Sequence, residues 1–94
     1  MVVFLTSCSE KPVTEFEEAR QALKYAVEQN APQFASETFV RAMAAFRAAE
    51  HEWQVQNARW NWERDSSTTV DLLVLATFDA HRATEEAIQN QRLQ

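Results

Sequence analysis

The sequence predicts an all-α fold: an elongated, antiparallel three-helix hairpin, similar to a coiled coil, with a long central helix. The first observation behind this prediction is that the 94 residues include no glycine, only two prolines and 15 alanines. An average chain of this length carries about six or seven glycines. Their absence argues against sites that need a positive backbone φ or a bare backbone, such as P-loops, dinucleotide-binding turns and tight hairpins. The second observation is that apolar residues recur at alternating intervals of three and four along three segments, as on the buried face of a helix.

The first predicted helix spans residues 14–30. Thr14 and Glu17 have the spacing of a capping box, in which the threonine oxygen accepts from the amide three residues on and the glutamate reaches back. The apolar stripe of this helix consists of Phe16, Ala19, Leu23 and Ala26. We expect the helix to end at Asn30, because asparagine tolerates the left-handed conformation, and Pro32 suits the first position of a following helix.

The central predicted helix spans residues 32–64, about 33 residues or about 50 Å. It contains no further helix breaker, and its stripe consists of Ala35, Phe39, Ala42, Phe46, Ala49, Trp53, Gln56 and Trp60. The first helix is about half as long, so we expect it to cover the central helix only to about Ala48. Residues 49–64 are then expected to pair with the third helix alone.

The third predicted helix spans residues 67–91. It follows residues 65–69, five poor helix formers that offer several capping side chains, among them Thr68 together with Asp71. Its stripe consists of Leu73, Ala76, Ala80, Ala83 and Ala87, flanked by Leu72, Leu75, Phe78 and Ile88. Because both connections are short, each helix is expected to fold back on its neighbour, which makes residues 14–94 one three-helix domain.

Residues 1–7 carry no charge and lead directly into the single cysteine. Leu5, Thr6, Ser7 and Cys8 resemble the lipobox of bacterial lipoproteins, in which an apolar residue and two small residues precede a cysteine. The resemblance implies cleavage before Cys8, a diacylglycerol thioether on its sulfur and usually an acylated amino group, with residues 8–13 as the lipidated tether. A complete signal has a basic start and about 7 to 15 apolar residues. We therefore interpret residues 1–7 as the remnant of a truncated signal peptide, or as the result of a start site placed too far downstream. The alternative is a frayed apolar terminus with an ordinary buried cysteine.

Tryptophan and arginine side chains gather toward the end of the predicted central helix: Trp53, Arg59, Trp60, Trp62 and Arg64. This helix is expected to extend past the first helix by about 16 residues, in the direction of Cys8. If Cys8 is acylated, we expect these side chains to lie near lipid headgroups, where tryptophan and arginine are favoured. The alternative is that the rings close the tip of the hairpin or form the seam of a homodimer.

Three short motifs carry a second resemblance: Ala-Arg-Gln-Ala-Leu at 19–23, Ala-Pro at 31–32 and Phe-Arg-Ala-Ala-Glu at 46–50. Over residues 14–88 the layout resembles the alanine-rich helical domain of unknown function in small bacterial envelope lipoproteins, which often precedes an outer-membrane-protein-A-like, peptidoglycan-binding domain. The sequence departs from that family at residues 70–75, and it does not include the second domain. The two resemblances imply a membrane partner, through lipid on Cys8, and a place in the bacterial cell envelope. By family analogy Ser9 favours the outer membrane, with the domain facing the periplasm.

Charge and residue spacing argue against several other functions. The formal net charge is −5 and the pI is about 4.9, without a basic stripe, so nucleic acid is not an expected partner. Glu50, His51 and Glu52 diverge around a helix and cannot converge on one ion, and His81 with Glu85 is more typical of a surface pair. We therefore expect no metal, no cofactor, no small-molecule substrate and no catalysis.

The function expected from the sequence is that of a lipid-anchored cell-envelope protein of structural or protein-interaction type. Its partner would be another envelope protein or further copies of this chain. The alternative is a soluble cytoplasmic helical adaptor or oligomerisation module whose first residues are a disordered start.

Overall fold

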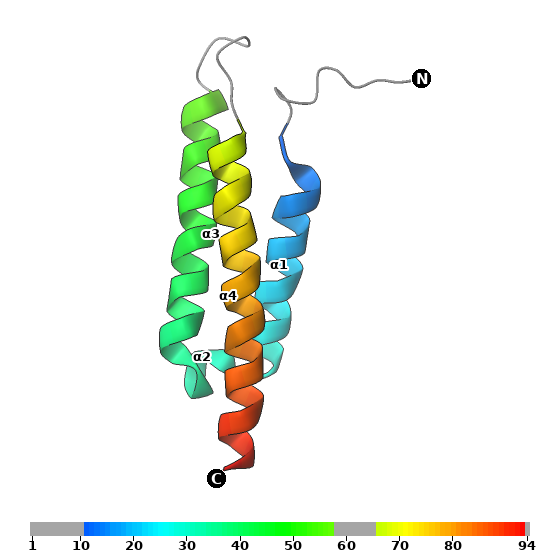
Figure 1. The fold of residues 1–94 in the computed structure, drawn as a ribbon, viewed down its shortest axis with the longest axis vertical. Coiled ribbons are helices and arrows are strands. Elements are labelled where there is room, and N and C mark those ends of the chain that lie inside the picture. Colours follow the sequence, from blue (N-terminus) through cyan, green and yellow to red (C-terminus); the bar gives the residue numbers. More distant parts are fainter. Residues whose placement is uncertain (1–10, 58–65, 94) are drawn as a thin grey trace, which may run out of the picture.

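The computed structural model describes residues 11–57 and 66–93, and every regular element in these ranges is an α-helix. In chain order the helices are α1 (Val13–Glu28), α2 (Ala31–Phe34), α3 (Ser36–Asn57) and α4 (Ser67–Arg92), as Figure 1 shows. The prediction of an all-α fold is therefore confirmed. The predicted first and third helices agree with α1 and α4 to within two residues at each end. In the described ranges no helix combines the length and the hydropathy needed to cross a bilayer.

The helix α4 is central, because it contacts α1, α2 and α3 and lies between the two other long helices in Figure 1. α1 and α4 run in the same direction, and α3 runs opposite to both. α1 and α3 touch at few points, one of which is an edge-on contact between the Phe16 and Phe46 rings with 6.0 Å between their centroids. α1 therefore packs mainly on α4 and not on α3, the long helix that follows it in the sequence. Short connections make neighbouring helices antiparallel, but they do not decide which helix lies in the middle.

Alanine dominates the core. The stripe predicted for α4 is completely buried, with 0% exposure for Leu73 and for all four alanines. The stripe predicted for α1 is also buried, and along the middle of the chain the buried stripe residues are Ala35, Ala42, Phe46, Ala49 and Gln56, with Phe39 and Trp53 packed against the core. Small side chains at the contact let helix axes approach closely. Among the described residues, Leu73 and Thr69 are the largest side chains that are fully buried.

The predicted central helix is interrupted at Ala35, which separates α2 from α3. Ala35 has φ −147° and ψ 47°, and its carbonyl oxygen accepts a hydrogen bond from the Phe39 amide at 2.9 Å, so that α3 begins from it. In an unbroken helix Phe34 and Phe39 would point about 140° apart. Here both pack against one cluster, which consists of Ala26, Ala31, Ala35, Ala83 and Ala87. The prediction of a continuous helix from Pro32 is therefore wrong, because packing against α4 outweighs helix propensity at this point.

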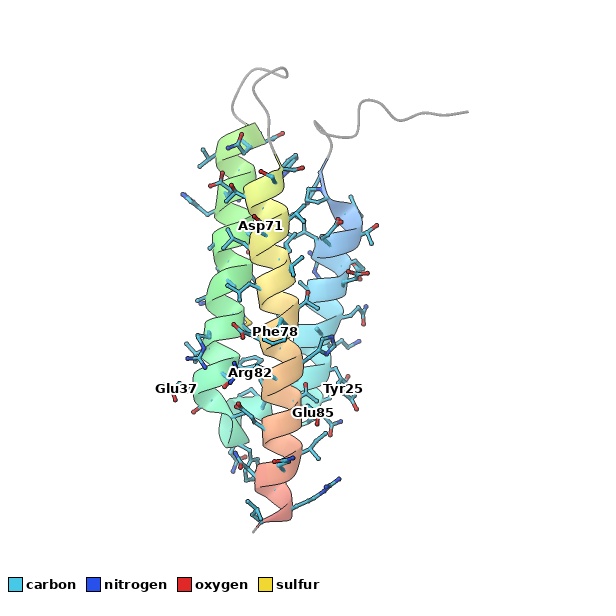
Figure 2. All side chains as sticks on the ribbon, in the orientation of Figure 1. Tyr25, Glu37, Asp71, Phe78, Arg82 and Glu85 are labelled. Atoms are coloured by element: carbon cyan, nitrogen blue, oxygen red, sulfur yellow. The ribbon has the colours of Figure 1, made fainter. Side chains whose placement is uncertain are left out.

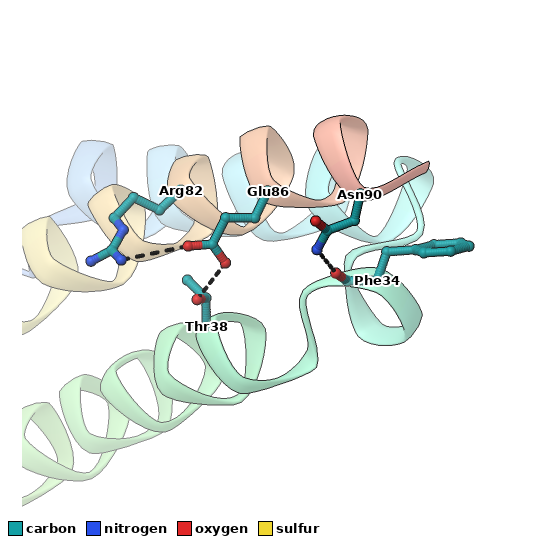
Figure 3. A network of polar contacts seen from close by, with 5 residues as sticks. All are labelled: Phe34, Thr38, Arg82, Glu86 and Asn90. Carbon is teal, nitrogen blue, oxygen red and sulfur yellow. Dashed lines mark hydrogen bonds and ion pairs between the residues drawn. The ribbon is translucent and has the colours of Figure 1, made fainter. Parts of the chain in front are cut away.

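Polar contacts with α4 fasten this junction, and Figure 3 shows them. The last carbonyls of a helix have no partner within it, and Asn90 Nδ2 donates to the carbonyl oxygen of Phe34 at 2.6 Å. Thr38 Oγ1 donates to Glu86 Oε1 at 2.7 Å, and Arg82 contacts the other Glu86 oxygen at 3.5 Å. These side chains hold α2 and the start of α3 against the last three turns of α4.

The turn between α1 and α2 is made without glycine, as predicted. Asn30 has φ 67°, the left-handed conformation, and Pro32 lies in the first turn of α2. Asn30 Nδ2 donates to Gln91 Oε1 at 3.1 Å, while Gln91 Nε2 donates to the Gln29 carbonyl oxygen at 2.8 Å. The turn is therefore fixed by an amide side chain of α4 as well as by its own backbone.

The two predicted side-chain caps do not form. α1 begins at Val13, one residue before Thr14, and the Phe16 amide donates to the Pro12 carbonyl oxygen at 3.0 Å. α4 begins at Ser67, so Thr68 lies within its first turn and not at its cap. A capping side chain needs a residue outside the helical φ and ψ range, and both predicted cap residues are already helical.

Candidate functional site

The described ranges meet residues 1–10 and 58–65 at one end of the bundle. The start of α1, the end of α3 and the start of α4 all lie at the top of Figure 1. Pro12 and Val13 line one depression with Ser66 and Val70, so the starts of α1 and α4 are neighbours. We call this the anchor end of the bundle, defined by Val13, Asn57 and Ser67.

Only one of the predicted contact residues lies in the described ranges. Trp53 is half-buried and packs against the core on α3. The lipobox residues Leu5, Thr6, Ser7 and Cys8, and the predicted contact residues Arg59, Trp60, Trp62 and Arg64, lie outside the described residues. The predictions for these eight positions stay predictions.

Where α1 and α3 touch, Phe16 lies against Phe46, the residue that a turn at about residue 31 places opposite it. Beyond this contact, Lys11, Phe16 and Arg20 line a cavity together with Glu50, Trp53 and Gln54. Lys11 precedes α1, so the segment before the helix also reaches the side of α3.

Two cations lie over the aromatic contact between α1 and α3. The Lys11 ammonium is 5.1 Å from the centroid of the Phe16 ring, and the Arg20 guanidinium carbon is 5.8 Å from that of the Phe46 ring. Arg20 also pairs with Glu17 at 2.9 Å. Cations in this position are attracted by the ring quadrupole, which stabilises the contact between α1 and α3.

The outward side of α4 carries large apolar side chains. Val74, Leu75 and Phe78 are 58%, 47% and 59% exposed, although the inward side of the same helix is mostly alanine. Asp71 and Arg82 lie on the same outward side, and Figure 2 shows them with Phe78 along α4. We call Asp71, Leu75, Phe78 and Arg82 the outer stripe of α4. The hydrophobic pattern places Leu75 and Phe78 on the flanks of the buried stripe. The outer stripe was therefore not predicted, although its intervals of four, three and four are visible in the sequence.

A groove of about 300 Å³ runs beside the outer stripe, between α1 and α4. It is lined by Glu15, Glu18, Leu73, Val74, Thr77, Phe78 and His81. No group of three or more histidine, cysteine, aspartate and glutamate side chains in the described part of the chain is placed to hold a metal ion.

No protein-family model, no curated protein and no solved structure matches this chain. Its function is therefore inferred from the anchor end, the outer stripe and the sequence motifs alone.

Proposed function

We propose that this chain is a lipid-anchored protein of the bacterial cell envelope, and that its helical domain is a structural or protein-interaction module without catalytic activity. The lipid is carried by Cys8, and the domain faces the periplasm from the outer membrane. In this proposal α1, α3 and α4 act as a coiled-coil-like three-helix hairpin, with α2 as part of its first turn.

The observation that carries the proposal is the position of the α1 start at the anchor end. Cys8 precedes Val13 by five residues, which span at most about 17 Å when fully extended. A lipid on Cys8 would therefore keep the anchor end close to the bilayer. The segment that contains Trp60 and Trp62 joins the chain at this same end, which supports its proposed contact with headgroups.

Metabolic labelling tests the lipid anchor. When the gene is expressed with its native upstream sequence in a Gram-negative host, we expect radiolabelled palmitate to enter the protein and globomycin to block its processing. The Cys8→Ala variant should lose the label, while the Ser9→Ala variant, which leaves the lipidated cysteine in place, should keep it. A wild-type protein that takes up no label contradicts the proposal.

The outer stripe of α4 favours one further candidate, a soluble cytoplasmic adaptor or oligomerisation module. An apolar patch of this kind on a small domain is typical of an interaction surface. Unlabelled wild-type protein in the soluble cell fraction supports this candidate, because it would need no anchor.

A further inference from the structure

The outer stripe of α4 has a symmetrical order of residues. Asp71, Leu75, Phe78 and Arg82 follow one another at intervals of four, three and four, which confines them to an arc of about 60° around the helix. Two apolar residues form its centre, with an acidic residue at one end and a basic residue at the other. Read from either end of the stripe, two apolar residues lie between two charged residues, and only the order of the acidic and the basic residue is reversed.

We infer that the outer stripe binds a second copy of this chain, with the two α4 helices antiparallel about a two-fold axis between Leu75 and Phe78. In this arrangement Leu75 faces the partner's Phe78, and Asp71 faces the partner's Arg82, at both ends of the interface. A two-fold contact uses the same patch on both subunits, and the outer stripe is complementary to itself only in the antiparallel orientation. A parallel pair would instead place Asp71 against the partner's Asp71 and Arg82 against the partner's Arg82.

The neighbouring residues agree with this register. Glu85, the next acidic residue on this side of α4, falls opposite the partner's Thr68, so like charges do not meet. Arg82 contacts Glu86 within its own chain, but the distance is 3.5 Å and the side chains are 50% and 40% exposed. Exposed pairs of this kind contribute little to stability, so the Arg82 guanidinium can turn toward a partner.

The distribution of apolar residues gives a reason for a second copy to bind here. Apart from Leu73, the apolar residues that α4 buries are alanines, whereas it exposes Leu75 and Phe78, so two large apolar side chains are left for an external contact. A single pair of helices over three turns forms an interface at the small end of the known range, which corresponds to a weak dimer. The inference rests on the proposed role as an interaction module but not on the lipid anchor, so the labelling experiment and the experiment below can fail independently.

The test uses the full chain with Cys8→Ala, so that neither a lipid nor a disulfide through Cys8 joins two copies. Sedimentation equilibrium from about 1 to about 500 μM should reveal a monomer–dimer equilibrium with a micromolar dissociation constant. Asp71→Arg or Arg82→Asp alone should weaken the dimer at least about tenfold, because each places like charges opposite one another at both ends. The double variant reverses both charges and should restore the dimer to within about threefold of the parent.

Matched variants keep the inference falsifiable. Phe78→Glu should abolish the dimer, while Val40→Glu, which changes a valine of similar exposure on α3, should leave it intact. Circular dichroism of each variant verifies that the helices are retained. In a mixture of Asp71→Cys and Arg82→Cys proteins, oxidation should form the mixed disulfide in preference to either homodimer, because only unlike positions face each other.

Three results would overturn the inference. The first is a protein that stays monomeric at every concentration. The second is a dimer that the single charge reversals do not weaken or the double variant does not restore. The third is a monomer whose binding to anionic lipid vesicles is lost with Phe78→Glu, which would assign the outer stripe to a membrane surface.

Discussion

Thr69 lies completely buried at the start of α4, and its Oγ1 has no hydrogen-bond partner among the described residues. A buried hydroxyl without a partner costs about 1–3 kcal/mol, and valine has nearly the same shape. We therefore expect Thr69→Val to raise the free energy of unfolding by about 1 kcal/mol, measured by urea denaturation followed by circular dichroism.

Thr84 is the matched control for this prediction. It lies on the same helix and is 4% exposed, but its Oγ1 donates to the Ala80 carbonyl oxygen at 3.1 Å. Thr84→Val removes a satisfied hydrogen bond and should lower the free energy of unfolding by about 0.5–1.5 kcal/mol. If both substitutions stabilise the protein equally, the missing partner of Thr69 is not the cause.

Asn30 holds the only positive φ among the described non-glycine residues. A left-handed backbone costs most residues about 1–2 kcal/mol, so Asn30→Ala should lower the free energy of unfolding by about that amount, and further through the lost bond to Gln91. Asn30→Gly keeps the backbone conformation and should recover most of the loss. Equal losses in the two variants, measured by thermal unfolding, would show that the side-chain bond and not the backbone determines the effect.

At the scale of helices, hydrophobic periodicity predicts which residues are buried. The stripe on α4 from Leu73 to Ala87 is fully buried because the spacing of its residues follows the period of the helix. The break at Ala35 could not be predicted in the same way. It depends on Asn90, Ala83 and Ala87 of α4, which are more than 40 residues away in the sequence. The outer stripe was missed for a different reason, since an apolar stripe alone does not say whether a neighbouring helix covers it.

Asn90 is expected to control the junction between α2 and α3. Asn90→Ala removes the donor to the Phe34 carbonyl oxygen, a hydrogen bond that contributes about 0.5–1.5 kcal/mol to the stability of the junction. Its loss should speed amide exchange of α2 and the first turn of α3 severalfold. Gln89→Ala, at an exposed neighbouring position on α4, is the control and should leave these amides unchanged. Uniformly faster exchange across the whole of α3 would instead indicate global destabilisation.

At the scale of the molecule, the bundle presents two separate candidate regions. The anchor end gathers the start of α1, the end of α3 and the start of α4, whereas the outer stripe runs along the exposed side of α4. In the antiparallel dimer the two anchor ends lie at opposite ends of the interface, so two copies held upright on one membrane by their anchor ends cannot form it, and the dimer is expected of copies that are not both anchored in this way.

The position of the tryptophans relative to the membrane is tested by fluorescence quenching. In vesicles that carry the acylated protein and brominated lipids, we expect quenching of a variant that keeps only Trp60 and Trp62, made with Trp53→Phe. The variant that keeps only Trp53, made with Trp60→Phe and Trp62→Phe, should be quenched much less, because Trp53 is half-buried against the core of the bundle. The Cys8→Ala protein, which lacks the anchor, should show little quenching of either kind. Equal quenching of both tryptophan sets would mean that the bundle lies along the membrane and is not held by its anchor end. Absence of quenching would place Trp60 and Trp62 away from lipid.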